Sequence, residues 1–231
     1  MRILAISDVE EAWLTDRYDR ERMAGVDVIV SCGDLAASYL EHIVTLANVP
    51  LLYVPGNHDT AYARHAPEGC VDIDGCIATY RGLRFMGLGG SVRYNDRVYG
   101  YTEQEMRWRA TKLSLIARMS GGIDVLVTHA PAYGHGDLGD LPHRGFEAFN
   151  AVLDALAPDT MVHGHVHLEY GRIARVSRHA SGTRIVNACG SRVFEVPDAP
   201  GADPRDCSLA VRRVARGGLV VDFRSQPNTL S

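Results

Sequence analysis

Five short polar clusters in this chain carry the residue types that bind divalent metal ions. Each contains a carboxylate, an amide or an imidazole, and each follows an apolar stretch. Carboxylate and amide oxygens suit hard divalent ions, whereas imidazole favours transition ions such as Mn, Fe and Zn. The mixture therefore indicates a transition-metal site. The clusters are Asp8-Val9-Glu10, Gly33-Asp34, Gly56-Asn57-His58-Asp59, Thr128-His129 and Gly164-His165-Val166-His167.

Four of these clusters come directly after β-branched runs that are typical of buried strands, at 3–6, 28–30, 51–54 and 125–127. In α/β proteins, ligands collect at the carboxyl ends of the strands. We therefore expect the clusters to converge in space although they are spread through the sequence.

The elements that must position the clusters alternate between strand and helix in the first half of the chain, which is typical of βαβ units. Thr102 and Glu105 form a capping-box pattern at the start of the strongest helix, and Gly121-Gly122 ends it. Strands are expected at 3–7, 28–32, 51–54, 77–81, 84–88 and 123–127; helices near 38–47, 102–119 and 146–156; and loops at 60–75 and around Gly82.

After Gly164 the pattern changes to short strands, at 172–176, 184–188, 209–214 and 219–223, the last two joined around Gly217-Gly218. A βα-rich half followed by a strand-rich half predicts an α/β fold with two stacked mixed β-sheets flanked by helices. We expect residues 1–231 to form a single domain, with a frayed tail at 226–231.

Composition excludes several classes of protein. A hydrophobic content of 46% and a charged content of 23% are ordinary for a globular protein. A net charge of −4 and scattered arginines argue against a nucleic-acid surface. No run is long enough to span a membrane, and no signal peptide is expected at the N-terminus. Five irregularly spaced cysteines do not form a disulfide framework, which predicts a cytoplasmic location.

The ordered set GD, GNHD, a separate His and GHVH resembles the calcineurin-like metallophosphoesterase superfamily over residues 2–188. The resemblance implies a four-layer sandwich and two divalent metal ions (Mn, Fe, Zn or Mg, with Mn or Fe favoured). It also implies a metal-dependent phosphoric ester hydrolase, in which hydroxide activated by both ions attacks a small phosphoester in line. Ions used in this way lie roughly 3.5–4 Å apart, and Asp34 is the natural bridge between them.

The resemblance assigns roles residue by residue. His58 would lie beside the ions without binding them, and would stabilise charge on the phosphate or protonate the leaving oxygen. Asp59 would orient the His58 imidazole. One metal would be held by Asp8, Asp34 and His167, and the other by Asp34, Asn57, His129 and His165.

Glu10 departs from the family pattern, which has Asp-x-His where this chain has Asp8-Val9-Glu10. Strand alternation would place residues 8 and 10 on the same side, so Glu10 is expected to bind a metal directly or through water. Alternatively, Glu10 points away as a solvated turn residue and the first metal site is weakened.

The segment 134–146 is similar to a loop in the branch of the superfamily that includes phosphodiesterases acting on cyclic nucleotides. Arg144, near a helix N-terminus, would bind the phosphate, and His135 would supply a proton to the leaving oxygen. The alternative is that His135 and His143 only pack the Gly-rich loop. An aromatic loop at Tyr94–Tyr101 would stack a base or an aromatic leaving group, or simply cover the sheet edge.

These features favour a phosphodiesterase that acts on a small phosphoester substrate. Phosphomonoesterase or phosphoprotein phosphatase activity is the weaker alternative, because Leu35-Ala36-Ala37 follows Gly33-Asp34 where Ser/Thr phosphatases have Asp-Arg-Gly. A non-catalytic scaffold of the same fold is the rival from another class. Glu10 keeps that reading open, whereas a non-ligand histidine such as His58 argues against it. The sequence does not indicate an oligomeric state.

Overall fold

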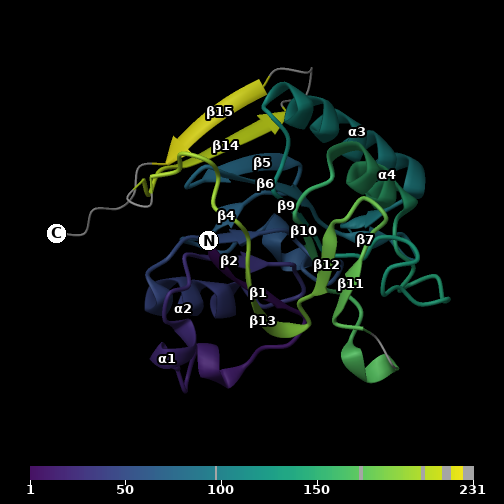
Figure 1. Ribbon diagram of the computed structural model, residues 1–231. Helices are drawn as coiled ribbons and strands as arrows, with labels where there is room; N and C mark the ends of the chain where they lie inside the picture. Colours follow the sequence, from purple (N-terminus) through teal and green to yellow (C-terminus); the bar gives the residue numbers. More distant parts are fainter. Residues whose placement is uncertain (97, 172–173, 204–205, 215–219, 226–231) are drawn as a thin grey trace.

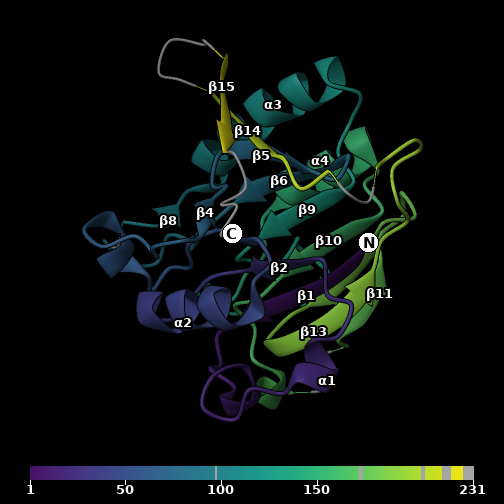
Figure 2. The same cartoon turned by 90° about the vertical axis from the view of Figure 1, so that its left-hand side faces the viewer.

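Two β-sheets stack face to face at the centre of the molecule, and helices cover their outer faces (Figure 1). The computed structural model describes residues 1–96, 98–171, 174–203, 206–214 and 220–225. Figure 2, turned by 90°, shows the order of the layers, with α2 on one side of the sheets and α3 on the other. The expected α/β class with two mixed sheets flanked by helices is confirmed.

The smaller sheet has five strands in the order β13-β1-β2-β3-β4. Its first four strands in the sequence run parallel, and β13 pairs antiparallel to β1. The strands are β1 (Arg2–Ser7), β2 (Val28–Ser31), β3 (Leu51–Tyr53), β4 (Val71–Asp72) and β13 (Gly190–Glu195). Its outer face is covered by the 3₁₀ turn η1 (Ala12–Leu14), α1 (Arg20–Met23) and α2 (Ala37–Ala47).

The larger sheet has eight strands in the order β11-β12-β10-β9-β6-β5-β14-β15. The helices α3 (Glu103–Met119) and α4 (Glu147–Leu156) cover its outer face. The strands are β5 (Cys76–Tyr80), β6 (Leu83–Leu88), β9 (Val125–Thr128), β10 (Thr160–His163), β11 (Val176–Arg178), β12 (Arg184–Asn187), β14 (Leu209–Val214) and β15 (Val220–Ser225). A parallel pair, β7 (Ser91–Val92) and β8 (Gly100–Tyr101), and the 3₁₀ turns η2 (Thr60–Ala63) and η3 (Leu168–Tyr170) complete the elements.

Burial on both faces explains why the central strands read as continuous apolar runs. In β1, Ile3 and Ala5 face the core between the sheets, whereas Leu4 and Ile6 face the helices. A half-exposed sheet would show polar residues at every second position, but a sheet covered on both faces cannot. Such strands are rigid, and their carboxyl ends hold the polar residues that follow them in fixed positions.

Most predicted elements are confirmed, including α3 with its capping box between Thr102 and Glu105 and the hairpin of β5 and β6. Three strands of the two stacked sheets are not predicted from the sequence. The strand β13 mixes buried and exposed residues at one edge of its sheet, β4 lies in the expected loop at 60–75, and β10 precedes the last polar cluster. Residues 172–173, the turn at Gly217-Gly218 and the tail at 226–231 lie outside the described residues.

Candidate metal centre

The polar clusters that follow β1, β2, β3, β9 and β10 converge on one cavity of about 220 Å³. The convergence expected from the strand ends is therefore seen. His129 lies at the base of this cluster and is fully buried. The cavity is lined by Asp8, Asp34, Asn57, His58, Tyr94, Pro142, His143, His165, His167 and Tyr170.

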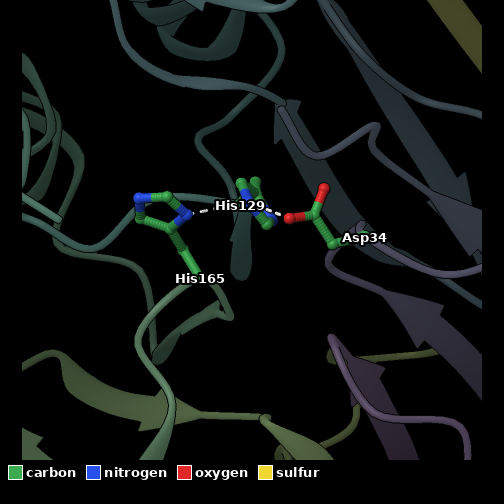
Figure 3. A group of neighbouring side chains, drawn as sticks. All are labelled: Asp34, His129 and His165. Atoms are coloured by element: carbon green, nitrogen blue, oxygen red, sulfur yellow. Dashed lines mark hydrogen bonds and ion pairs between the residues drawn. The ribbon is translucent and has the colours of Figure 1, made fainter. Parts of the chain in front are cut away.

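His129 is the centre of a set of converging ligand atoms (Figure 3). Its Nε2 lies 3.0 Å from Oδ1 of Asn57, 3.3 Å from Oδ2 of Asp34 and 3.1 Å from Nδ1 of His165. Its Nδ1 lies 2.7 Å from the Cys32 carbonyl oxygen and donates to it, so in the neutral ring Nε2 presents a lone pair. Lone pairs that face one another at this distance repel unless a proton or a metal ion lies between them. The donor set therefore fits a divalent metal ion.

The electrostatics of the pocket also favour a positive charge at this point. Burial alone would lower the pKa of His129, but the carboxylate of Asp34 raises it to about 9. Burial opposes ionisation of Asp34, yet His129 and the His58 backbone N–H, 2.8 Å from Oδ1, hold the pKa of Asp34 well below its usual range. Asp34 is therefore an ionised carboxylate that faces an imidazole, and a bound ion would compensate its charge.

His165 is held as a neutral imidazole, the form that can bind a metal ion. Its Nε2 donates to the carbonyl oxygen of Pro142 at 2.7 Å, so Nδ1 is the atom that faces His129. Burial lowers the pKa of His165 to about 3. A carbonyl oxygen that fixes the distant ring nitrogen is the usual way in which proteins orient metal-binding imidazoles. His129, held by Cys32, follows the same rule.

A second group of ligand atoms lies beside the first. Both carboxylate oxygens of Asp8 accept the backbone N–H of His165, at 2.9 and 3.1 Å. The Nε2 of His167 lies 3.8 Å from Oδ1 of Asp8, and the His167 ring stacks on Tyr170 with centroids 5.1 Å apart. Burial raises the pKa of Asp8. Asp34 lines the same cavity and is placed between the two groups in the sequence-based assignment.

The backbone conformation at the polar clusters lets their segments approach one another closely. Asp8, Asp34 and His165 adopt left-handed conformations, with φ of 65°, 56° and 67°, which are uncommon for L residues. A Cβ atom at Gly56 would overlap Oδ1 of Asp34, and one at Gly164 would overlap the Ser7 hydroxyl. Only glycine fits at these two places, which explains their positions in the motifs.

Asp59 ties two of the clusters together. One of its carboxylate oxygens, Oδ2, accepts the backbone N–H groups of Asp34 and Gly56, both at 2.7 Å. The side chain is largely buried, and burial raises its pKa to about 6. Asp59 therefore positions the turns that carry Asp34 and Asn57. The predicted orientation of the His58 imidazole by Asp59 stays a prediction.

The structure does not bring Glu10 to the cavity. Its Oε1 accepts the backbone N–H of Ala36 at 3.2 Å, at the start of α2, where a helix dipole favours a carboxylate. The expected ligation assumed that strand alternation continues to residue 10. However, β1 ends at Ser7, and the left-handed Asp8 turns the chain. In this structure Glu10 is therefore an exposed residue that contacts the residue before α2, and it points away from the cavity as in the alternative.

His135 and Arg144 also lie away from the cavity lining. The ring of His135 packs against His179, with centroids 5.1 Å apart. The guanidinium of Arg144 lies 5.0 Å from the centroid of the Tyr133 ring and 3.5 Å from the Glu147 carboxylate. Arg144 precedes α4 as expected, but its side chain turns towards Tyr133 and the first turn of that helix. Neither residue is in the described lining of the cavity, and their contacts with substrate stay predictions.

Four residues of the cavity lining were not assigned to it from sequence, namely Tyr94, Pro142, His143 and Tyr170. Tyr94 bonds to Asn57, His143 pairs with Asp140 at 2.7 Å, and Tyr170 stacks on His167. Two of them had a signal in the sequence. His143 lies in the loop that resembles a phosphodiesterase branch, and Tyr94 begins the aromatic loop that was expected to stack a base or to cover the sheet edge. Tyr170 reaches the cavity because η3 turns the chain back directly after His167.

Comparisons with known proteins identify the class. A family model described as the calcineurin-like phosphoesterase superfamily domain matches residues 1–199. The chain therefore belongs to this superfamily and is a metal-dependent phosphoester hydrolase. Members of the family generally bind two divalent metal ions. No curated protein matches the chain in sequence.

Solved structures resemble the molecule along its whole length. TT1561 of Thermus thermophilus is 14% identical with a TM-score of 0.56, covering 96% of this chain and 97% of that one. A Vps29 double mutant from Entamoeba histolytica is 13% identical with a TM-score of 0.41, covering 97% and 98%. A metallophosphoesterase from Sphaerobacter thermophilus is 17% identical with a TM-score of 0.35, covering 99% and 90%. The first of these shows a shared fold. Among the described residues, no helix is long and apolar enough to cross a membrane.

Proposed function

We propose that this protein is a phosphodiesterase that hydrolyses a small phosphodiester with two divalent ions, Mn²⁺ or Fe²⁺. The observation that carries the proposal is the convergence of imidazole, carboxylate and amide ligand atoms on His129 Nε2 at the base of an open cavity. One ion would be held by Asp34, Asn57, His129 and His165, and the other by Asp8, Asp34 and His167.

Bound ions would act as Lewis acids on the phosphoryl oxygens and lower the pKa of coordinated water. The protein supplies the rest of the chemistry. The carboxylates of Asp8 and Asp34 balance the charge of the ions, and the backbone contacts of both hold them in place. His58 lines the cavity from the turn that carries Asn57. There its imidazole donates to the phosphate or to the leaving oxygen.

The described side chains that line the cavity, leaving the two ions aside, offer no permanent cation for the second negative charge of a monoester. This lining, all within the described part of the chain, includes the carboxylates of Asp8 and Asp34 but neither lysine nor arginine. A phosphomonoester is largely dianionic at neutral pH, whereas a diester carries a single negative charge. Arg144, which was expected to bind the phosphate, packs on Tyr133 instead. A monoanionic diester therefore fits this cavity better.

Side-by-side turnover of bis-p-nitrophenyl phosphate and p-nitrophenyl phosphate tests the proposal. The protein is stripped of metal, restored with Mn²⁺, and its bound metal is counted. We expect Mn-dependent cleavage of the diester, at a higher kcat/KM than the monoester, with two ions per chain. Cleavage of the monoester alone would make the protein a phosphatase. Cleavage of neither, with one ion or none bound, would support the scaffold alternative.

We also propose that the protein acts in the cytoplasm. All five cysteines are present as thiols, three of them buried, which suits a reducing compartment. Microscopy of a fluorescent fusion tests this, and export of the fusion from the cell would contradict it.

A further inference from the structure

Tyr94 enters the cavity from a loop that belongs to none of the metal-binding clusters. The loop lies between β7 and β8, and the Tyr94 hydroxyl is 3.1 Å from Nδ2 of Asn57. Its ring is partly exposed, and it shares the cavity wall with His58. A tyrosine that contacts a candidate metal ligand at the mouth of the site is placed to meet whatever binds there.

The direction of this hydrogen bond follows from the other contact of Asn57. Oδ1 of Asn57 lies 3.0 Å from Nε2 of His129, where a lone pair is needed for a bound ion. The amide nitrogen Nδ2 therefore faces Tyr94, and since an amide NH₂ group only donates, the phenol oxygen is the acceptor. Tyr94 thus fixes the amide with its oxygen towards His129, where Asn57 would hold a bound ion.

The phenol still has its own proton to donate. A hydroxyl group carries one donor and two lone pairs, and Asn57 uses only a lone pair. In the described part of the chain, the contact with Asn57 is the hydrogen bond seen at this hydroxyl. The phenol O–H is therefore available to an acceptor bound within the cavity.

The loop that carries Tyr94 is anchored at both ends, so the hydroxyl is held in place before substrate binds. The guanidinium of Arg93 pairs with both carboxylate oxygens of Glu105, at 2.9 and 3.1 Å, and its Nε donates to the Gly100 carbonyl oxygen. The backbone N–H of Gly90 donates to the carbonyl oxygen of Pro55 at 2.8 Å. These contacts tie the loop to α3 and to the segment that precedes Asn57.

We propose that Tyr94 is a substrate-binding residue whose O–H donates to a non-bridging oxygen of the phosphoryl group while its oxygen holds the Asn57 amide. The proposal rests on the proposed phosphoesterase function and deepens it. A neutral donor suits a monoanionic diester, because it stabilises charge that develops on the phosphoryl oxygens without adding charge to a cavity that lacks lysine and arginine in its described lining.

The experiment compares Tyr94→Phe with wild type and with Tyr133→Phe in Mn-reconstituted protein. Tyr133 is an exposed tyrosine that packs on Arg144 away from the cavity, so it is the matched control. We expect Tyr94→Phe to lower kcat/KM for bis-p-nitrophenyl phosphate by about 10- to 100-fold, the usual effect of losing a hydrogen bond to a charged group. Bound manganese should stay at the wild-type number, and Tyr133→Phe should behave as wild type.

A second measurement separates a direct contact from a purely structural role. With the two enantiomers of methyl p-nitrophenyl phosphorothioate, the effect of Tyr94→Phe should shrink for one enantiomer only, because sulfur at the contacted position is a poor acceptor. Equal losses for both enantiomers, or a loss explained by missing manganese, would overturn the substrate contact. An unchanged kcat/KM would overturn it as well.

The affinity for inorganic phosphate tests the role of Tyr94 without requiring turnover. Calorimetry with inorganic phosphate and the Mn-loaded protein should show about tenfold weaker binding in Tyr94→Phe. If wild type cleaves no phosphoester, the proposed function fails, and the phosphate affinities still decide the role of Tyr94. Equal affinities of wild type and Tyr94→Phe would then overturn it.

Discussion

The backbone N–H of His165 donates to both carboxylate oxygens of Asp8, which joins the first polar cluster of the chain to the last. Asp8 directly follows β1 in the smaller sheet, and His165 follows β10 in the larger one. The contact therefore crosses from one sheet to the other, directly at the proposed metal centre. The site is built at the seam of the sandwich, where neither sheet alone could form it.

The proposed bridge, Asp34, is tested by Asp34→Asn. The amide keeps the size of the side chain but loses the charge that balances both ions, so we expect loss of bound metal and a fall in kcat/KM of about 100-fold or more. Metal counting by mass spectrometry and diester turnover measure this. Asp154→Asn, on the exposed surface of α4, is the control and should change neither. Full metal retention in Asp34→Asn would show that the bridge is misplaced.

Removing His58 should separate chemistry from metal binding. Because His58 lines the cavity but is not among the proposed ligands, His58→Ala should keep the wild-type metal content while kcat falls by about 10²- to 10⁴-fold, the usual contribution of a general acid. His65→Ala, which changes an exposed histidine in the following loop, should leave kcat unchanged. Wild-type turnover in His58→Ala would remove this residue from the mechanism.

Glu10 and Asp8 form an informative pair, since the family-like motif contains both. Glu10→Gln should leave metal stoichiometry and turnover within about twofold of wild type, with at most about 1 kcal/mol of lost stability from the weakened contact with Ala36. Asp8→Asn should lose metal and activity. Atomic absorption measures the metal bound per chain in both variants. Loss of an ion in Glu10→Gln would return Glu10 to the ligand set.

Asp59→Ala should destabilise the site through the backbone. The change leaves the N–H groups of Asp34 and Gly56 without their shared acceptor, and two hydrogen bonds to a charged group are together worth about 3–6 kcal/mol. We expect a lower melting temperature in calorimetry and weaker metal binding. Unchanged stability and metal affinity would show that the two turns keep their positions without Asp59.

The stability of the α3 N-terminus should depend on pH through Glu105. Hydrogen bonds from Thr102 hold the pKa of Glu105 below its usual value of 4.5. A depressed pKa adds stability that is fully present above pH 4.5 and is lost as the pH falls through the folded-state pKa. In urea unfolding, the difference in stability between wild type and Glu105→Gln should therefore shrink below pH 4.5. A constant difference from pH 3 to 7 would contradict this.

The layers of the fold could be predicted because apolar runs and capping signals are local properties. Residues 3–6 read as a doubly buried strand, and the pattern of Thr102 and Glu105 marks the start of α3. In contrast, β13 could not be seen, because an edge strand with exposed positions resembles a loop in sequence. Its pairing with β1 depends on residues far away in the chain.

The residue types of the candidate site could be predicted from the sequence. The directions in which its surrounding side chains point could not. Glu10 was expected beside Asp8 by strand alternation, which a single left-handed residue breaks. Arg144 was placed correctly before α4, yet its direction depends on Tyr133. Tyr94 reaches Asn57 only through the tertiary placement of its loop. Each of these outcomes depends on contacts between distant segments.

Manganese titration of the metal-free protein, followed by diester turnover at each ratio, tests the central claim most directly. The arrangement around His129 and Asp8 predicts that cleavage of bis-p-nitrophenyl phosphate rises with bound manganese and reaches its maximum at two ions per chain. Cleavage that needs no metal, or no cleavage at any ratio although two ions bind, would contradict it.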